Sequence, residues 1–290
     1  MSSLRRFGFL FLSLLAVALP AGEKLVAITP ELTGAWVTPD GKWDGRTVLL
    51  LHGFADDMDG AGDLTKRLAG ELAAHGIASL RINFRGEGDK KRTNIESTLA
   101  TRLADVEEAY GAMVEKPGLD MLRVGVCGWS LGATTAIEYG AQHTERFKTM
   151  ALWSSPSGDM FAMWQSNPTA QAALRDGVAT EDVPGWKKIT TKREFYESFR
   201  GVNSDKSLAK YPGAFLTIRG SNDMLTQHDA DFMKILAARS ASMFDAKEPR
   251  PPAEAVLIGG ADHIFNVFTP GAAEPARVIE LTVAWFERTL

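Results

Sequence analysis

Residues 128–132 read Gly-Trp-Ser-Leu-Gly, and they lie between an apolar run, Leu122 to Cys127, and a helix-like stretch, Ala133 to His143. A Gly-x-Ser-x-Gly sequence in this position is typical of a sharp turn from a strand into a helix, with the serine exposed at the bend. Glycines are needed there because such a tight turn leaves little room for side chains. The pattern predicts that Ser130 is a nucleophile, and a glycine-rich turn without chemical function is the simpler alternative.

Two further polar residues stand just past predicted strands. Asp223 follows the apolar strand predicted for Ala214 to Arg219, and His263 follows the one predicted for Ala255 to Ile258. A serine hydroxyl needs a base that accepts its proton and a carboxylate that orients the base. The chain order Ser130, Asp223, His263 is the order expected of an α/β-hydrolase arrangement. We therefore predict these three as nucleophile, acid and base.

The sequence His52-Gly53-Phe54 leaves the end of a buried strand predicted for Val48 to Leu51. In this setting the loop usually supplies one backbone N–H group to an oxyanion hole, and the residue after the nucleophile supplies the other. We predict the N–H groups of Phe54 and Leu131 as these two donors. His52 is interpreted as a residue that shapes the loop, and not as the base.

With these motifs the chain resembles the α/β-hydrolase superfamily, and within it the feruloyl (cinnamoyl) esterases and serine aminopeptidase-like proteins. The matching stretches are Leu50–Phe54, Gly76–Gly88, Gly128–Gly132, Arg219–Asp223 and Gly259–His263. The resemblance implies an α/β-hydrolase fold, with a mostly parallel central sheet, helices on both faces and an inserted lid. It also implies a serine hydrolase that acts on a small-molecule ester and uses no cofactor.

Apolar runs alternate with helical patterns along most of the chain, which is typical of a parallel sheet covered on both faces. The remaining strands are predicted for Ile77–Phe84, Leu122–Cys127 and Thr149–Trp153, and the helices for Leu64–Gly76, Leu99–Met113, Ala133–His143 and Ala276–Arg288. These elements form one domain, because a chain of 290 residues with 45% hydrophobic residues can bury one large core.

The segment from Pro156 to Tyr211 shows no clear alternation of strand and helix. We predict that residues 156–211 form a lid, which divides the core into residues 22–155 and 212–290. Most of the aromatic rings of the lid are expected to form its own small core. The sharper hypothesis is that some of them, with Trp164 and Trp186 as candidates, roof an apolar substrate pocket. Trp129, next to the serine, is a further candidate contact.

The amino terminus has the features of a secretory signal peptide. Arg5 and Arg6 precede an uncharged, largely apolar run from Phe7 to Ala21 that ends in small residues. The run is shorter than the roughly 20 residues that a membrane span needs, although an uncleaved anchor is the alternative. We therefore expect residues 1–21 to be removed and the protein to be exported, either periplasmic or secreted.

Charge and cysteine content exclude other classes of function. The formal net charge of −4 offers no basic field for nucleic acid. The single cysteine, Cys127, cannot form an intrachain disulfide and is expected to be buried, and no cluster of His and Cys has metal-ligand spacing, so no metal site is predicted. The acidic run of Asp56, Asp57 and Asp59 could select a cationic substrate, but a solvated loop is the favoured interpretation.

Three functions follow from these patterns. The first is a hydrolase for carboxylic esters of small or aromatic acyl groups, and the second is an aminopeptidase-like or amide hydrolase with the same nucleophile. The third is a non-catalytic binding protein on the same scaffold, which the presence of nucleophile, acid and base disfavours. The oligomeric state stays open.

Overall fold

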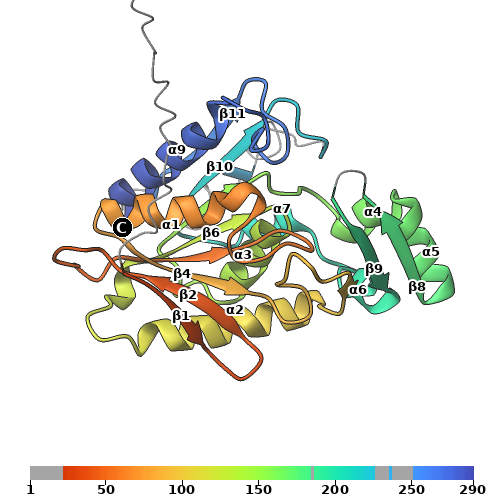
Figure 1. The fold of residues 1–290 in the computed structure, drawn as a ribbon, viewed down its shortest axis with the longest axis horizontal. Helices are drawn as coiled ribbons and strands as arrows, with labels where there is room; N and C mark the ends of the chain where they lie inside the picture. Colours follow the sequence, from red (N-terminus) through yellow and green to blue (C-terminus); the bar gives the residue numbers. More distant parts are fainter. Residues whose placement is uncertain (1–21, 184–185, 226–234, 237–250) are drawn as a thin grey trace, which may run out of the picture.

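The computed structural model describes residues 22–183, 186–225, 235–236 and 251–290. Within them, the dominant feature is an eight-stranded sheet with the order β1-β2-β4-β3-β6-β7-β10-β11 (Figure 1). The strands are β1 (Glu23–Ala27), β2 (Thr33–Val37), β3 (Thr47–Leu51), β4 (Ala78–Asn83), β6 (Val124–Trp129), β7 (Thr149–Trp153), β10 (Ala214–Gly220) and β11 (Ala253–Ile258). In this spatial order, the neighbouring strands from β4 through β3, β6, β7 and β10 to β11 pair in parallel. At the other edge, β1 pairs antiparallel with β2, and β2 pairs antiparallel with β4. The predicted α/β class with a mostly parallel sheet is confirmed.

Each strand predicted from the sequence overlaps an observed one, and the boundaries differ by at most two residues. The strand predicted for Leu122–Cys127 begins two residues later, because Met121–Arg123 form a short 3-10 turn capped by the Asp120 side chain. Strands β1 and β2 were not predicted. They form an antiparallel edge in which β1 is only partly buried, so no apolar run marks it.

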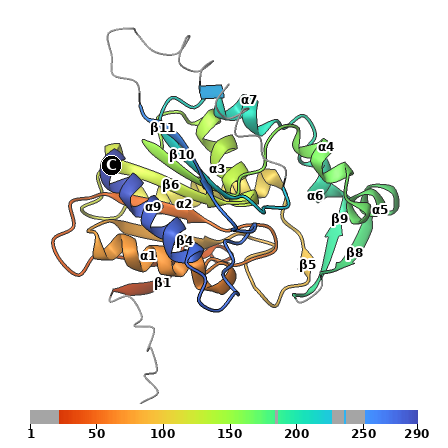
Figure 2. The same cartoon turned by 90° about the horizontal axis from the view of Figure 1, so that it is seen from above.

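Helices cover both faces of the sheet (Figures 1 and 2). They are α1 (Leu64–Ala74), α2 (Leu99–Val114), α3 (Leu131–Gln142) and α9 (Glu274–Thr289). Helices α1 and α9 pack on the side chains of Val48 and Leu50, whereas α2 and α3 share a core with Leu49 and Leu51. Successive side chains of a strand point to opposite faces of the sheet, and helices cover both faces of β3. The strand is therefore buried throughout, as its unbroken apolar sequence predicts.

Most of the segment between β7 and β10 forms a separate group of elements beside the sheet, at the right of Figure 1, whereas its last helix lies against α3. It contains α4 (Met160–Gln165), α5 (Pro168–Asp176), β8 (Val178–Asp182), β9 (Lys188–Lys192), α6 (Arg193–Glu197) and α7 (Ser204–Leu208). Strands β8 and β9 pair antiparallel, and β5 (Asn94–Ile95) adds to β9. The sequence shows no clear alternation of strand and helix here because β8 is mostly exposed and its polar residues hide the strand pattern.

Aromatic residues of this segment pack on one another in a small core, as expected, and a few residues of the main domain join this core. The cluster includes Phe161, Phe195, Tyr196 and Phe199, packed with Leu131 beside the nucleophile candidate. That the segment acts as a lid stays a prediction. The predicted signal peptide, residues 1–21, lies outside the described residues. None of the helices seen in the described ranges is long and apolar enough to cross a membrane.

The strand order places the site. From β3 the chain proceeds outward to β4 and then returns to the other side of β3 as β6. In open parallel sheets, ligands bind beyond the carboxyl ends of the strands where the order reverses in this way. The loop after β3 and the turn after β6 therefore meet at the point where a substrate is expected.

Candidate active site

Ser130 occupies the turn between β6 and α3 with φ 53° and ψ −117°, a conformation that L-residues rarely adopt. The surrounding glycines allow this turn. A β-carbon on Gly128 would collide with the carbonyl of Gly132, and one on Gly132 would collide with the carbonyls of Leu51 and His52. The Ser130 N–H donates to the carbonyl of Trp153 over 2.8 Å, which ties the turn to β7.

The three residues predicted as nucleophile, acid and base form one hydrogen-bonded chain. His263 Nε2 lies 3.0 Å from Ser130 Oγ, and His263 Nδ1 lies 2.8 Å from Asp223 Oδ1. The Asp223 side chain is 1% exposed and its Oδ1 also accepts the Leu225 N–H over 2.9 Å. The His263 ring is 16% exposed, so it can reach both the buried carboxylate and a ligand at Ser130.

The neighbouring Asp262 does not compete with Asp223 for the ring. Its Oδ1 accepts the backbone N–H groups of Ile264 and Asn266 at 3.0 and 2.7 Å. An aspartate that hydrogen-bonds nearby backbone N–H groups in this way is typical of a turn. Asp262 therefore shapes the loop that presents His263.

Two residues hold the backbone of His263. Its carbonyl oxygen accepts the Ser154 hydroxyl over 2.9 Å and the Trp129 indole N–H over 3.3 Å. Trp129, a predicted substrate contact, lines the pocket but is only 4% exposed. Trp129 therefore holds the backbone of His263 and also forms part of the pocket wall. The contact of Ser154 with His263 was not predicted.

The predicted oxyanion donors face the same space. Phe54 and Leu131 both line the pocket that contains Ser130 and His263. Within the described residues, the backbone N–H groups of Phe54 and Leu131 have no protein acceptor. Two unpaired N–H groups beside a serine hydroxyl are suited to bind a negative oxygen.

The pocket has a volume of about 960 Å³ and mostly apolar walls. Trp164 and Trp186, both predicted as contacts, line it together with methionines of α4. The Trp164 ring packs edge-on against Phe54, with ring centres 5.6 Å apart, and against Phe195. Trp186 is 50% exposed, so it forms part of the rim.

One end of the pocket is charged, through Asp56, Asp63 and Lys90. The interpretation of the acidic run as a solvated loop is wrong for Asp56, whose residue is only 8% exposed. Burial raises the pKa of the Asp56 carboxyl to about 6. Lys90 Nζ lies 3.4 Å from Asp57 and 3.2 Å from Asp63, so its charge is partly neutralised.

His52 is fully buried, in line with its predicted role in shaping the loop. Its Nε2 accepts the Phe84 N–H over 3.1 Å, so Nδ1 carries the proton and donates to the Gly53 carbonyl over 2.7 Å. Burial lowers the pKa of His52 to about 4, which keeps the ring neutral. Cys127 is likewise buried, and burial raises the pKa of its thiol.

Part of the chain matches a known protein family by sequence. Residues 44–186 match the sequence model of a family described as serine aminopeptidase. The comparison with curated protein sequences found no match.

Solved structures cover nearly the whole chain. Est1E from Butyrivibrio proteoclasticus, solved with ferulic acid bound, has a TM-score of 0.69 and 15% identity over 89% of this chain and 95% of that chain. An esterase of Pyrococcus furiosus has a TM-score of 0.61 and 20% identity over 91% of each chain. Dipeptidyl peptidase 4 of Porphyromonas gingivalis has a TM-score of 0.60 and 14% identity over 92% of this chain and 35% of that chain. At these identities the likeness concerns the fold.

Proposed function

We propose that this protein of the α/β-hydrolase fold is a serine hydrolase that cleaves carboxylic esters of small or aromatic acyl groups. The observation that carries the proposal is the hydrogen-bonded chain from Ser130 through His263 to Asp223, which opens into a large apolar pocket. A binding protein would have no need of a strained serine aligned with a histidine and a buried carboxylate.

The first half of the reaction forms an acyl-enzyme. Ser130 Oγ attacks the ester carbonyl carbon while His263 Nε2 accepts the hydroxyl proton. Asp223 stabilises the imidazolium that results, and the N–H groups of Phe54 and Leu131 bind the carbonyl oxygen as it becomes negative. The bond to the leaving oxygen then breaks, and His263 returns the proton to the departing alcohol.

The second half repeats these steps with water. His263 accepts a proton from water, and the resulting hydroxide attacks the acyl carbon bound to Ser130. The same two N–H groups bind the second oxyanion. When the bond to Ser130 Oγ breaks, His263 returns the proton to the serine, and a carboxylic acid leaves.

The pocket supports an apolar acyl group of small or aromatic type. Its walls include Met160, Met163 and Trp164 from α4, with few polar atoms between them. Such walls favour apolar groups because their contact with water is lost on binding. That Est1E was solved with ferulic acid bound fits an aromatic acyl group on the same fold.

An aminopeptidase-like or amide hydrolase is the second candidate, and a specific observation favours it. Asp56 and Asp63 lie at the charged end of the pocket, where carboxylates would attract a substrate ammonium group. The match to a serine aminopeptidase model and the fold likeness to a dipeptidyl peptidase are in keeping with it. Fold alone does not separate the two chemistries.

The test is a panel of 4-nitrophenyl esters and aminoacyl 4-nitroanilides assayed with the purified protein and its Ser130→Ala variant. We expect turnover of acetate and benzoate esters, slower or no turnover of the anilides, and loss of activity in the variant. A fluorophosphonate probe should label the wild-type protein and leave Ser130→Ala unlabelled. Ester turnover that survives in Ser130→Ala would refute the proposed nucleophile, and preference for the anilides would favour the second candidate.

A further inference from the structure

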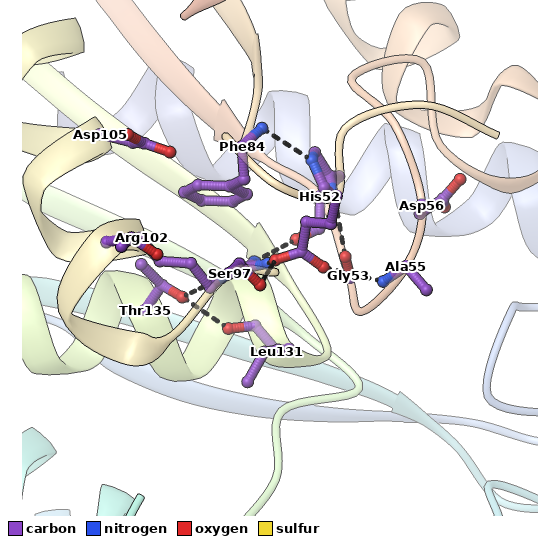
Figure 3. A network of polar contacts seen from close by, with 12 residues as sticks. His52, Gly53, Ala55, Asp56, Phe84, Ser97, Arg102, Asp105, Leu131 and Thr135 are labelled. Carbon is purple, nitrogen blue, oxygen red and sulfur yellow. Dashed lines mark hydrogen bonds and ion pairs between the residues drawn. The ribbon is translucent and has the colours of Figure 1, made fainter. Parts of the chain in front are cut away.

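A buried ion pair is hydrogen-bonded to the loop that follows β3, and Figure 3 shows the network of polar contacts around its arginine, Arg102. The ion pair joins Glu87, in the loop after β4, to Arg102 on α2, and the side chains of both residues are 0% exposed. Removing two charges from water is costly, and the loss is offset only where geometry and further hydrogen bonds are good. The partners of this pair therefore indicate what it holds in place.

The Glu87 carboxylate is fully engaged. Oε2 accepts the Ala55 N–H over 2.9 Å, and Oε1 accepts the Ser97 hydroxyl over 2.8 Å and the Arg102 guanidinium. Burial alone would raise the pKa of Glu87, but Arg102 and these hydrogen bonds bring the pKa below its ordinary value. Glu87 is thus an anion, which binds the Ala55 N–H more strongly than a neutral acceptor would.

The Arg102 guanidinium reaches two other segments. Nη2 donates to the His52 carbonyl over 2.8 Å, and Nε donates to Thr135 Oγ1 over 2.9 Å. Thr135 Oγ1 in turn donates to the Leu131 carbonyl over 2.9 Å. The guanidinium also stacks on the Phe84 ring, 3.6 Å from its centre, which fixes the plane of this rigid fork.

These contacts surround both predicted oxyanion donors. Phe54 lies between His52, whose carbonyl Arg102 holds, and Ala55, whose N–H Glu87 holds. Ala55 has a φ of 55°, which is strained for a residue with a side chain and persists only where neighbours impose it. Leu131 is held through Thr135. One ion pair therefore restrains the backbone on both sides of the oxyanion site.

We propose that Glu87 and Arg102 are positioning residues that set the separation and direction of the Phe54 and Leu131 N–H groups. The inference rests on the proposed function, because it assigns a role in a reaction that forms an oxyanion. The pair touches no substrate. It acts on the transition state, in which the oxygen is negative, and much less on the bound ester, in which the oxygen is nearly neutral.

The sharpest variant is Thr135→Val, which removes the link from Arg102 to Leu131 while keeping the side-chain volume and both charges. We expect kcat for 4-nitrophenyl acetate to fall on the order of tenfold, because a small misplacement of a reacting geometry has effects of this size or larger. KM should be unchanged. Thr135→Ser, which keeps the hydroxyl, should restore kcat.

The matched control is Thr289→Val on α9. Thr289 is also a buried helical threonine. Its hydroxyl donates to the Trp285 carbonyl over 2.8 Å and shares a hydrogen bond of 3.0 Å with the hydroxyl of Thr149, which lies at the opposite end of β7 from the site. The kcat and KM of Thr289→Val should equal those of the wild type, even if the unfolding temperature of this variant falls as much as that of Thr135→Val. Equal losses of kcat in the two valine variants would overturn the proposal.

A pair of inhibitors isolates the oxyanion. An aryl trifluoromethyl ketone forms a tetrahedral adduct with a negative oxygen, whereas the corresponding methyl ketone binds largely as the neutral ketone. Thr135→Val should raise the inhibition constant of the first by the factor that kcat falls, and leave that of the second unchanged. If both constants change equally, or neither changes, the proposal is wrong.

The pair itself is tested by the double variant Glu87→Gln with Arg102→Gln, which removes both charges and leaves none unpaired. We expect the same pattern, a lower kcat at constant KM. Unchanged kcat in a folded double variant would overturn the proposal. Activity that persists in Ser130→Ala would instead refute the proposed function, so the two failures are distinguishable.

Discussion

The Trp129 indole N–H donates to the backbone carbonyl of His263, a contact of 3.3 Å between residues 134 positions apart in the sequence. Trp129 directly precedes Ser130, so the element that carries the proposed nucleophile also holds the backbone of the proposed base. Ser154, at the end of β7, donates to the same oxygen. The alignment of His263 with Ser130 therefore depends on two strands of the sheet as well as on its own loop.

Replacing Trp129 with phenylalanine should lower kcat by a few-fold, because a hydrogen bond of this kind contributes about 1 kcal/mol. KM for a small ester should change little. Trp36→Phe is the matched control, since Trp36 is equally buried and its indole N–H has no acceptor in the described residues. The measurement is kcat and KM of both variants by steady-state kinetics. A fall in kcat of the same size in Trp36→Phe would contradict the role of the Trp129 contact.

Asp56 should make the stability of the protein depend on pH. Its pKa in the folded state is about 6, above the ordinary value of 3.8, because burial disfavours the charged form. Below 3.8 the carboxyl is protonated in both states and has no effect. As the pH rises from 3.8 to about 6, the unfolded state ionises before the folded state does, so the folded state loses stability, on the order of 3 kcal/mol in all for a shift of this size.

The substitution Asp56→Asn removes this loss of stability, because an asparagine side chain does not ionise. We expect the variant to have a higher free energy of unfolding than the wild type well above pH 6, and the same value below pH 3.8. Urea unfolding at the two extremes measures the difference. A constant difference at all pH values would show that the carboxyl has no raised pKa in the folded protein.

Asp56 should also affect the choice of substrate. If an ammonium group binds at the charged end of the pocket, kcat/KM for an aminoacyl ester should rise relative to that of its uncharged analogue as Asp56 ionises near pH 6. Asp56→Asn should abolish this relative rise. A ratio that stays constant across this range would place the ammonium group elsewhere.

Trp186 at the rim should distinguish aromatic from aliphatic esters. Because the residue is half exposed, Trp186→Ala should leave the unfolding temperature nearly unchanged. It should lower kcat/KM for 4-nitrophenyl benzoate more than for the acetate. Leu25→Ala, at an exposed position on β1, is the control and should change neither. An equal loss for both esters would argue against contact between Trp186 and the acyl group.

The proposed export is tested at the amino terminus. Protein recovered from the periplasm or medium of an expressing cell should lack residues 1–21, as determined by mass spectrometry of its first peptide. Retention of the apolar run Phe7 to Ala21 in a membrane fraction would favour the uncleaved anchor instead.

Much of the site could be predicted because its parts lie at strand ends. Ser130, Asp223 and His263 each follow a short apolar run that reads as a buried strand. The carboxyl ends of parallel strands share one edge, so residues distant in sequence meet there without any long-range information. The local turn chemistry of Gly128 and Gly132 then fixes which residue is exposed.

The buried pair could not be predicted in the same way. Glu87 lies in a loop and Arg102 on a helix, and each has an ordinary solvated interpretation. One signal was present: Arg102 follows Leu99 by three positions and precedes Val106 by four, which places it on the apolar face of α2. A charge on a buried face requires a partner, but the partner comes from tertiary structure alone. Strands β8 and β9 escaped prediction because polar residues predominate in both, and one of the two buried positions of β9 is Thr191, so no apolar alternation marks them.

Gly132 lies where the first turn of α3 comes closest to the end of β3, with no space for even a methyl group. The methyl group of an alanine at this position would collide with the carbonyls of Leu51 and His52. The collision would push the helix that carries Leu131 away from the strand that leads to Phe54. The width of the proposed oxyanion site therefore depends on how closely the backbones of α3 and β3 approach at Gly132, where a residue with a side chain would not fit.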